Sequence, residues 1–184
     1  MLKGLNLYLV GMMGVGKTTV GRELATRLGY QFFDTDTLVE QVAGKTINEI
    51  FTLDGESIFR QIETQVLAEL STYTRKAIAT GGGIVLRREN WSYLHHGLIV
   101  WLDAPVELLI SRLQNDTTRP LLKNPDPAGE LQKLLDQRQR LYAQADLKIS
   151  VSTGETPEEI ATRVIEAIPS VLKPPAVYLN ENGQ

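Results

Sequence analysis

The sequence feature that most constrains this chain is a glycine-rich segment near its start. Residues 11–18 read GMMGVGKT and fit the pattern G-x-x-x-x-G-K-[ST], whose glycines let backbone N–H groups turn toward a phosphate. An apolar run at residues 5–10 precedes the segment and a helical pattern at 17–28 follows it. The positive end of that helix also favours an anion. The sequence therefore predicts a phosphate-binding loop between a buried strand and a helix.

The last residues of this loop indicate a nucleotide with a metal ion. Lys17 can reach the β- and γ-phosphates as a point charge, and the Thr18 hydroxyl can ligate Mg²⁺. We expect nucleotide contacts from Gly14, Val15, Gly16, Lys17, Thr18 and Thr19. A guanine-specific protein would need an N-K-x-D segment, and no asparagine of the chain begins one. ATP with Mg²⁺ is the expected ligand.

The rest of the chain alternates short apolar runs with helical patterns. The further runs lie at residues 31–33, 77–80, 98–102 and 147–151. Strands separated by ten or more helical residues cannot pair as hairpins, so we expect a parallel sheet with helices on both faces. The fold class is α/β in three layers, and residues 1–173 form a single domain. Residues 174–184 contain Pro-Pro and no periodicity, which predicts a frayed tail.

Two stretches interrupt this alternation. Residues 37–73 show only helical patterns, with a capping box from Thr46 to Glu49, and we expect an inserted helical segment there. Residues 115–129 are rich in Asn, Asp, Pro and Thr, which predicts a mobile loop before a helix at 130–145. Arg119 lies in this loop and Arg112 one turn before it, so the loop is interpreted as a lid that completes charge stabilisation. A solvated loop arginine is the alternative.

Composition excludes several classes of function. The net charge of −3 and a pI of about 5.5 argue against binding nucleic acid through bulk positive charge. No apolar run approaches the roughly 18 residues of a membrane helix, so no membrane association is expected. The chain has no cysteine, which fits a reducing cytoplasm and leaves no disulfide, thiolate metal site or cysteine nucleophile.

Asp34 and Asp36 follow the second predicted strand, at the sheet edge where α/β proteins bind ligands. If the extended conformation continues, both carboxylates point to one side. They could then hold Mg²⁺ or accept a proton from an attacking hydroxyl. Alternatively, Asp36 simply caps a helix that begins at Thr37. No aspartate ends the third strand, so Asp34 would have to supply the carboxylate that supports magnesium.

Two arginines lie where apolar residues are expected. Arg138 interrupts the apolar stripe of the helix at 130–145, while Arg140 points away from that stripe. A charge on an inward face is costly unless paired, so Arg138 meets either an internal carboxylate or an anionic ligand. Arg60 borders the apolar face of the helix at 56–70, where the alternative is a surface pair with Glu63. Residues 81–83, GGG, permit close approach by a ligand.

Six segments in this order resemble the shikimate kinase family, within the nucleoside-monophosphate-kinase-like group of P-loop folds. The resemblance covers residues 5–170 and rests on GMMGVGKTTVGRELA, DTD, FRQIE, ATGGG, DTTRPLL and QRQRLY. It implies transfer of the ATP γ-phosphoryl group to the 3-hydroxyl of shikimate, on the way to aromatic amino acids. It also implies the strand order 2-3-1-4-5 and a monomer.

The resemblance assigns a role to each candidate residue. Arg60 and Arg138 would clamp the shikimate carboxylate, Asp36 would accept from the reacting hydroxyl, and the Gly82 N–H would fix the ring. The implied apolar wall consists of Phe51 and Phe59. The implied magnesium ligands are Thr18 and, through water, Asp34. The implied nucleotide arginines are Arg112, which would lie along adenine, and Arg119, which would face the phosphates. Residues 152–156, STGET, lack the basic residue that some members place near adenine.

Two other functions fit parts of this pattern. A kinase for another small polyol acid, such as gluconate, would share the fold and the phosphate loop. A nucleotide-binding module that has lost its chemistry would share the fold alone. The combination of Lys17 and Asp36 with three arginines, Arg60, Arg119 and Arg138, favours a kinase for shikimate.

Overall fold

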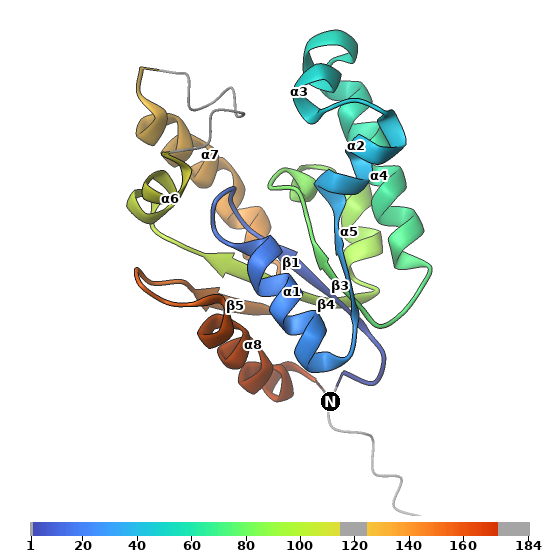
Figure 1. Cartoon of the computed structure of the whole chain (residues 1–184), viewed down its shortest axis with the longest axis vertical. Helices are drawn as coiled ribbons and strands as arrows, with labels where there is room; N and C mark the ends of the chain where they lie inside the picture. Colours follow the sequence, from blue (N-terminus) through green and yellow to red (C-terminus); the bar gives the residue numbers. More distant parts are fainter. Residues whose placement is uncertain (1, 115–124, 173–184) are drawn as a thin grey trace, which may run out of the picture.

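A sheet of five parallel strands lies at the centre of the molecule (Figure 1). The computed structural model describes residues 2–114 and 125–172. The strands are β1 (Asn6–Val10), β2 (Gln31–Asp34), β3 (Lys76–Ala79), β4 (Gly97–Asp103) and β5 (Leu147–Ser150), in the order β2-β3-β1-β4-β5. Each lies within one residue of a predicted apolar run. The parallel pairing and the strand order implied by the resemblance are both confirmed.

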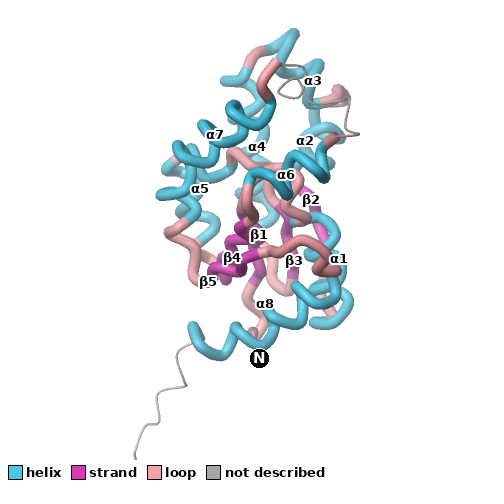
Figure 2. The backbone as a smooth tube through the Cα atoms, turned by 90° about the vertical axis from the view of Figure 1, so that its left-hand side faces the viewer, coloured by secondary structure: helices cyan, strands magenta, loops and turns pink. Residues whose placement is uncertain are grey.

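Helices cover both faces of the sheet (Figure 1 and Figure 2). α1 (Lys17–Leu28) and α8 (Pro157–Val171) pack against each other on one face. α4 (Glu56–Ser71), α5 (Arg88–Leu94) and α7 (Pro127–Tyr142) lie on the other, and α6 (Val106–Leu113) packs against α7. Right-handed crossovers between parallel strands produce this division. The three-layer α/β architecture is confirmed.

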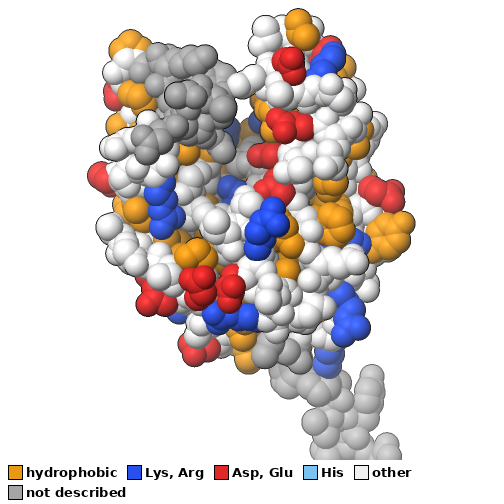
Figure 3. Space-filling view, in the orientation of Figure 1, with side chains coloured by type: hydrophobic (Ala, Val, Ile, Leu, Met, Phe, Trp, Pro, Cys, Tyr) orange, Lys and Arg blue, Asp and Glu red, His pale blue; other side chains and the backbone are white. Residues whose placement is uncertain are grey.

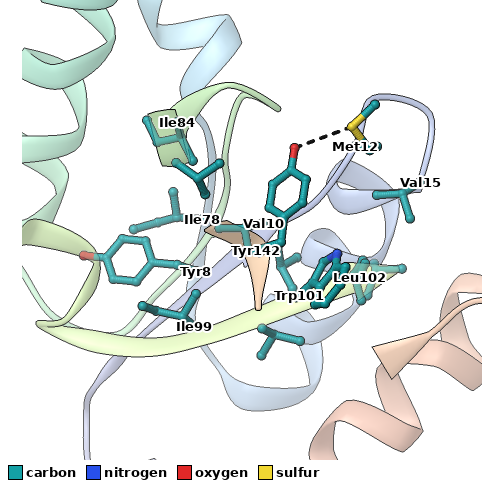
Figure 4. Packing of buried hydrophobic residues seen from close by; sticks show 14 of the residues in the cluster. Tyr8, Val10, Met12, Val15, Ile78, Ile84, Ile99, Trp101, Leu102 and Tyr142 are labelled. Carbon is teal, nitrogen blue, oxygen red and sulfur yellow. Dashed lines mark hydrogen bonds between the residues drawn. The ribbon is translucent and has the colours of Figure 1, made fainter. Parts of the chain in front are cut away.

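The core follows from burial of the sheet on both faces. All five residues of β1 are buried, as expected of a central strand between two helical layers. Figure 4 shows Ile78 and Ile99 beside Tyr8, with Tyr142 of α7 next to Trp101 of β4. The rings of Trp101 and Tyr142 are stacked with centroids 5.9 Å apart. The sheet therefore gives a rigid base to the loops at its carboxyl edge.

The segment between β2 and β3 contains only helices among its described elements. It consists of α2 (Thr35–Ala43), α3 (Ile47–Glu49), the π-helix η1 (Ile50–Asp54) and α4, and the predicted capping box of Thr46 and Glu49 is present. α2 begins at Thr35, because the Asp34 side chain caps it by accepting a hydrogen bond from the Asp36 N–H. The predictions that Asp36 caps this helix and that the chain stays extended through Asp36 are therefore wrong.

The predicted start of the helix after the loop is also wrong. α7 begins at Pro127, because Pro127 fits the first helical turn and the Asp126 side chain accepts a hydrogen bond from the Gly129 N–H. Residues 127–129 of the predicted lid at 115–129 are therefore helical, while residues 115–124 and the predicted tail at 174–184 lie outside the described residues. The helix ends at Tyr142 rather than at 145. Within residues 2–114 and 125–172, no helix is long and apolar enough to cross a membrane.

Candidate active site

The phosphate loop connects β1 to α1 and has the backbone conformation that its glycines allow. Gly11 and Gly16 have φ angles of 141° and 104°, a region that other residues rarely adopt. The buried Lys17 ammonium donates hydrogen bonds to the carbonyls of Gly11 and Met12, both at 2.8 Å. The lysine therefore lies along the inside of the loop, at the N-terminus of α1.

Thr18 and Thr19 follow in the first turn of α1. The Thr18 hydroxyl donates a hydrogen bond to Asp34 Oδ2 at 2.7 Å, which joins the first turn of α1 to the end of β2. The Thr19 hydroxyl bonds instead to the Gly16 carbonyl at 3.0 Å. Thr18 and Asp34 thus bring a hydroxyl and a carboxylate oxygen together beside the phosphate loop. In the described part of the chain, no three His, Cys, Asp or Glu side chains gather as a metal-binding group.

Arg112 lies on the far side of the same loop, in the last turn of α6. Its guanidinium donates to the Val15 carbonyl at 2.9 Å and lies 3.5 Å from the Gly14 carbonyl. The sequence-predicted nucleotide arginine therefore contacts the loop directly. Arg119, the predicted lid arginine, lies outside the described residues.

Of the three glycines after β3, Gly81 and Gly83 have charged side chains pressed against their backbone. A Cβ placed on Gly81 would lie 2.6 Å from Asp36 Oδ1 and 2.8 Å from Glu63 Oε1, and one on Gly83 would overlap the Arg60 guanidinium. None of the three has a positive φ, so the requirement is for space rather than for an unusual backbone. The glycine segment is therefore the place where Asp36, Arg60 and Glu63 converge.

Gly82 joins this charged group to the phosphate loop. A Cβ on Gly82 would lie 3.6 Å from the Gly11 carbonyl oxygen, 3.6 Å from the Met13 nitrogen and 3.7 Å from Arg138 Nη1. The middle glycine thus has the phosphate loop on one side and the arginine of α7 on the other. Figure 3 shows the surface hollowed beside the helical segment of α2 to α4, with side chains of both charges lining the hollow.

Arg60 and Glu63 form a pair inside this site. Arg60 Nη1 and Glu63 Oε2 are 2.7 Å apart, and the two side chains are 12% and 1% exposed. The alternative of a surface pair is therefore wrong, because this pair is almost completely removed from water. The exposed Glu56 carboxylate adds a weaker contact to Arg60 at 3.3 Å.

Glu63 is an unusual carboxylate. Burial raises the pKa of the Glu63 carboxyl, and the positive charge and hydrogen bond of Arg60 act in the opposite direction. The field of Asp36 raises this pKa further, and that of Arg138 lowers it. Among the described residues, Glu63 Oε1 has no hydrogen-bond donor. Glu63 is thus the internal carboxylate that Arg138 faces electrostatically, while Arg138 also lies at the hollow beside Gly82.

Tyr142 fixes the position of Arg138 and of the glycine segment. Its buried hydroxyl donates to the Gly82 carbonyl at 2.6 Å and lies 3.7 Å from the sulfur of Met12, a contact drawn in Figure 4. Burial raises the pKa of Tyr142 to about 12, and a hydrogen bond with Arg138 and its charge oppose this rise. The hydroxyl therefore stays protonated and ties α7 to both loops.

Aromatic side chains border the arginine pair. The rings of Phe51 and Phe59 lie 4.7 Å apart, and the Arg60 guanidinium lies over the Phe59 ring at 4.9 Å from its centroid. Phe59 is buried, and Phe51 is partly exposed. The two predicted wall residues therefore form one apolar surface next to Arg60.

Three residues of this arrangement were not among the predicted site residues. Glu63 appeared in the sequence as a surface partner, Tyr142 as one more member of an apolar stripe, and Thr35 not at all. The Thr35 hydroxyl is buried and accepts a hydrogen bond from the Gly81 N–H at 2.9 Å. A signal existed only for Tyr142, since a tyrosine on a buried stripe needs a partner for its hydroxyl.

Comparisons with known proteins agree with this geometry. The family model described as "Shikimate kinase" matches residues 13–169. A shikimate kinase from Nostoc sp. (strain PCC 7120) is 64% identical and the match covers 94% of this chain and 96% of the relative. A shikimate kinase from Nostoc punctiforme is 62% identical, with 97% and 98% covered.

Solved structures give the same result. The shikimate kinase from Acinetobacter baumannii in complex with shikimate is 42% identical, with a TM-score of 0.87 over 90% of this chain and 93% of that one. The shikimate kinase from Aquifex aeolicus is 34% identical, with a TM-score of 0.78 over 90% and 97%. The P-loop of this chain meets a buried arginine–carboxylate cluster at Gly82. By these matches, the chain belongs to the shikimate kinase family.

Proposed function

We propose that this chain transfers the γ-phosphoryl group of ATP to the 3-hydroxyl of shikimate, giving shikimate 3-phosphate and ADP in the synthesis of chorismate and aromatic amino acids. The observation that carries this proposal is the position of Gly82. Its Cβ direction points into the space between the phosphate loop and Arg138 Nη1. A phosphate donor bound to the loop and a carboxylate bound to Arg138 would therefore lie side by side.

The nucleotide side has residues for each part of a bound triphosphate. The backbone of Gly14, Val15 and Gly16 surrounds the phosphates, and Lys17 exchanges its loop carbonyls for phosphate oxygens. Thr19 supports the first turn of α1, and Arg112 lies against the loop on the side proposed for adenine. Arg119 is proposed as the arginine that faces the transferred phosphoryl group.

The Thr18 hydroxyl and the Asp34 carboxylate fit Mg²⁺, because both are hard oxygen ligands and lie 2.7 Å apart next to the phosphate loop. Mg²⁺ retains most of its waters in such sites, which suits a position with one hydroxyl, one carboxylate and the phosphates of the substrate. When bound, the ion neutralises phosphate charge during transfer.

The acceptor side holds shikimate by its charge and orients its reacting hydroxyl. Arg60 and Arg138 bind the carboxylate, and the Phe51–Phe59 surface packs against the ring. Asp36 accepts the proton of the 3-hydroxyl, and the Gly82 N–H fixes the ring beside the phosphate loop. Catalysis then rests mainly on positioning and on charge placed around a loose transition state.

The test is identification of the product. The chain is incubated with ATP, Mg²⁺ and either shikimate or gluconate, and ADP release is followed while ³¹P NMR identifies the phosphate ester. Shikimate-dependent ADP release with an ester at the 3-position is expected. Faster ADP release with gluconate than with shikimate would show that the chain is a gluconate kinase. The absence of ADP release that depends on either acceptor would show that the chain only binds the nucleotide. We further propose a monomer that acts in the cytoplasm.

A further inference from the structure

A second hollow lies at the opposite edge of the sheet from the phosphate loop. It has a volume of about 510 Å³ and lies between α2, α4 and the first residues of β2 and β3. Parallel strands carry the proposed active site at their carboxyl ends, whereas this cavity is lined by Gln31 and Lys76, which begin their strands. None of its lining residues belongs to the site described above.

The walls of the cavity are largely apolar. They are formed by Phe33, Leu38, Val42, Val66, Leu70 and Tyr73. Val42 and Tyr73 are also among the most exposed large hydrophobic residues of the described chain, at 66% and 57% exposure. An apolar cavity of this size, with few polar groups, has the composition of a small-molecule site.

Gln31, Gln65, Glu69 and Lys76 are the polar residues of this lining, and Lys76 is its one basic residue. Its side chain is buried, with 5% of the residue exposed, and its ammonium lies 4.1 Å from the centroid of the Tyr73 ring and 5.6 Å from that of Phe33. Among the described residues, its ammonium donates no hydrogen bond and has no carboxylate within 4.0 Å. The three donors of this cation therefore face aromatic surface and the cavity.

Among the described residues, the Lys76 ammonium has no directly bonded anion, although the Glu69 carboxylate also lines the cavity. Burial lowers the pKa of Lys76, and the Glu69 carboxylate on the exposed rim acts only partly against this effect. Aromatic faces stabilise a cation less than a directly bonded carboxylate does once both are removed from water. A ligand with an anionic group could form the charge-assisted hydrogen bond that no described residue forms with the Lys76 ammonium.

We propose that this cavity binds a small carboxylate with an apolar body, whose carboxylate bonds to Lys76 while its body packs against Phe33, Leu38 and Leu70. The charge of Lys76 selects ligands with an anionic group, and the apolar wall selects ligands whose remaining part is apolar. Because the cavity shares no residue with the proposed active site, both sites can be occupied at the same time.

The experiment is calorimetry of the full chain with 3-phenylpropanoate, in the presence of saturating shikimate. Shikimate occupies the arginine pair of the active site, so that a second carboxylate cannot bind there. We expect one molecule bound per chain, and binding at least tenfold weaker for the uncharged 3-phenylpropanamide, since the amide cannot form the charge-assisted bond.

Three variants locate the site. Lys76→Met keeps the length of the side chain and should weaken binding of 3-phenylpropanoate at least tenfold. Val42→Asp, at the exposed rim, should also weaken it by repulsion and serves if Lys76→Met does not fold. Lys133→Met is the matched control, because the Lys133 side chain is 69% exposed on α7 and lies outside the cavity.

Several results would overturn the proposal. These are no binding in the wild-type chain, equal affinity for the amide, or loss of binding on addition of shikimate. Unchanged affinity for 3-phenylpropanoate in both Val42→Asp and Lys76→Met would also overturn it. Self-association in sedimentation velocity that Val42→Asp abolishes would show that a second copy covers the cavity instead.

Discussion

At the scale of single residues, Glu63 explains how the Arg60 guanidinium is balanced and oriented in a site with little water. The carboxylate is almost fully buried and bonds to the guanidinium through Oε2. Burying a cation without such a partner would destabilise the fold. Because the guanidinium is planar, a bond from one of its nitrogens to Glu63 also fixes the directions of its other N–H donors. Glu63 therefore orients Arg60 for the carboxylate that we propose Arg60 binds, without having to touch that carboxylate itself.

This role predicts the kinetic effect of Glu63→Gln. The variant keeps the shape of the side chain but loses the charge-assisted bond, so the KM for shikimate should rise about tenfold while the KM for ATP changes little. Glu56→Gln is the matched control, because Glu56 also contacts Arg60 but is largely exposed. Steady-state kinetics with both substrates measure the difference. Equal effects of the two variants would show that the buried partner has no special role.

The raised pKa of Glu63 predicts a pH dependence of stability. A carboxyl whose pKa is higher in the folded than in the unfolded chain binds its proton more tightly when folded, so it favours folding most at low pH. That contribution is lost as the pH rises from about 4.5, the ordinary value, through the raised one. The free energy of unfolding of the wild type should therefore fall relative to that of Glu63→Gln between pH 4 and pH 7. Urea unfolding at both pH values measures it, and a constant difference would contradict the raised pKa.

At the scale of elements, Asp34 serves two structures with two oxygens. Oδ1 accepts from the Asp36 N–H and caps α2, and Oδ2 accepts from the Thr18 hydroxyl beside the phosphate loop. One side chain thus sets where β2 ends, where α2 starts and where the proposed metal ligand Thr18 lies. Asp36 consequently sits in the first helical turn, facing Gly81, instead of continuing the strand.

The two roles of Asp34 can be separated by substitution. Asparagine caps a helix about as well as aspartate but carries no charge, so Asp34→Asn should keep the melting temperature and raise the Mg²⁺ concentration for half-maximal activity about 10- to 100-fold. Asp34→Ala should show the same loss and also lose about 1 kcal/mol of unfolding free energy. Magnesium titrations and thermal melts measure both. Normal magnesium dependence in Asp34→Asn would remove Asp34 from the metal site.

Strands were predictable from the sequence to within one residue, because burial on both faces makes each one a short continuous apolar run. Helix starts were less predictable, because several side chains compete to cap each one. Asp34 and Asp36 are both good caps, and only their geometry decides between them. At α7, Asp126 and Pro127 are a good N-cap and a good first helical residue, and the helix does begin there. The polar composition of residues 115–129 led to the prediction of a loop over this start.

At the scale of the whole molecule, the candidate site is assembled from segments far apart in the chain. The phosphate loop, Asp36, the arginine of α4, the glycine segment and α7 meet at the carboxyl edge of the sheet, as parallel α/β topology requires. The residues with an unexpected charge, such as Arg138, were therefore detectable in the sequence. The residues that hold them were harder to find: the stripe position of Tyr142 indicated only that its hydroxyl needs a partner, and the role of Glu63 depends on burial and on residues of other elements.

Binding of an acceptor carboxylate by Arg138, as we propose for this edge of the sheet, can be tested by one double comparison. The kcat/KM for shikimate and for its uncharged methyl ester is measured with the wild type, with Arg138→Met and with Arg140→Met, whose exposed arginine lies on the same helix. We expect the wild type and Arg140→Met to prefer shikimate about 10- to 150-fold, and Arg138→Met to lose most of this preference. An unchanged preference in Arg138→Met would show that Arg138 does not bind the carboxylate.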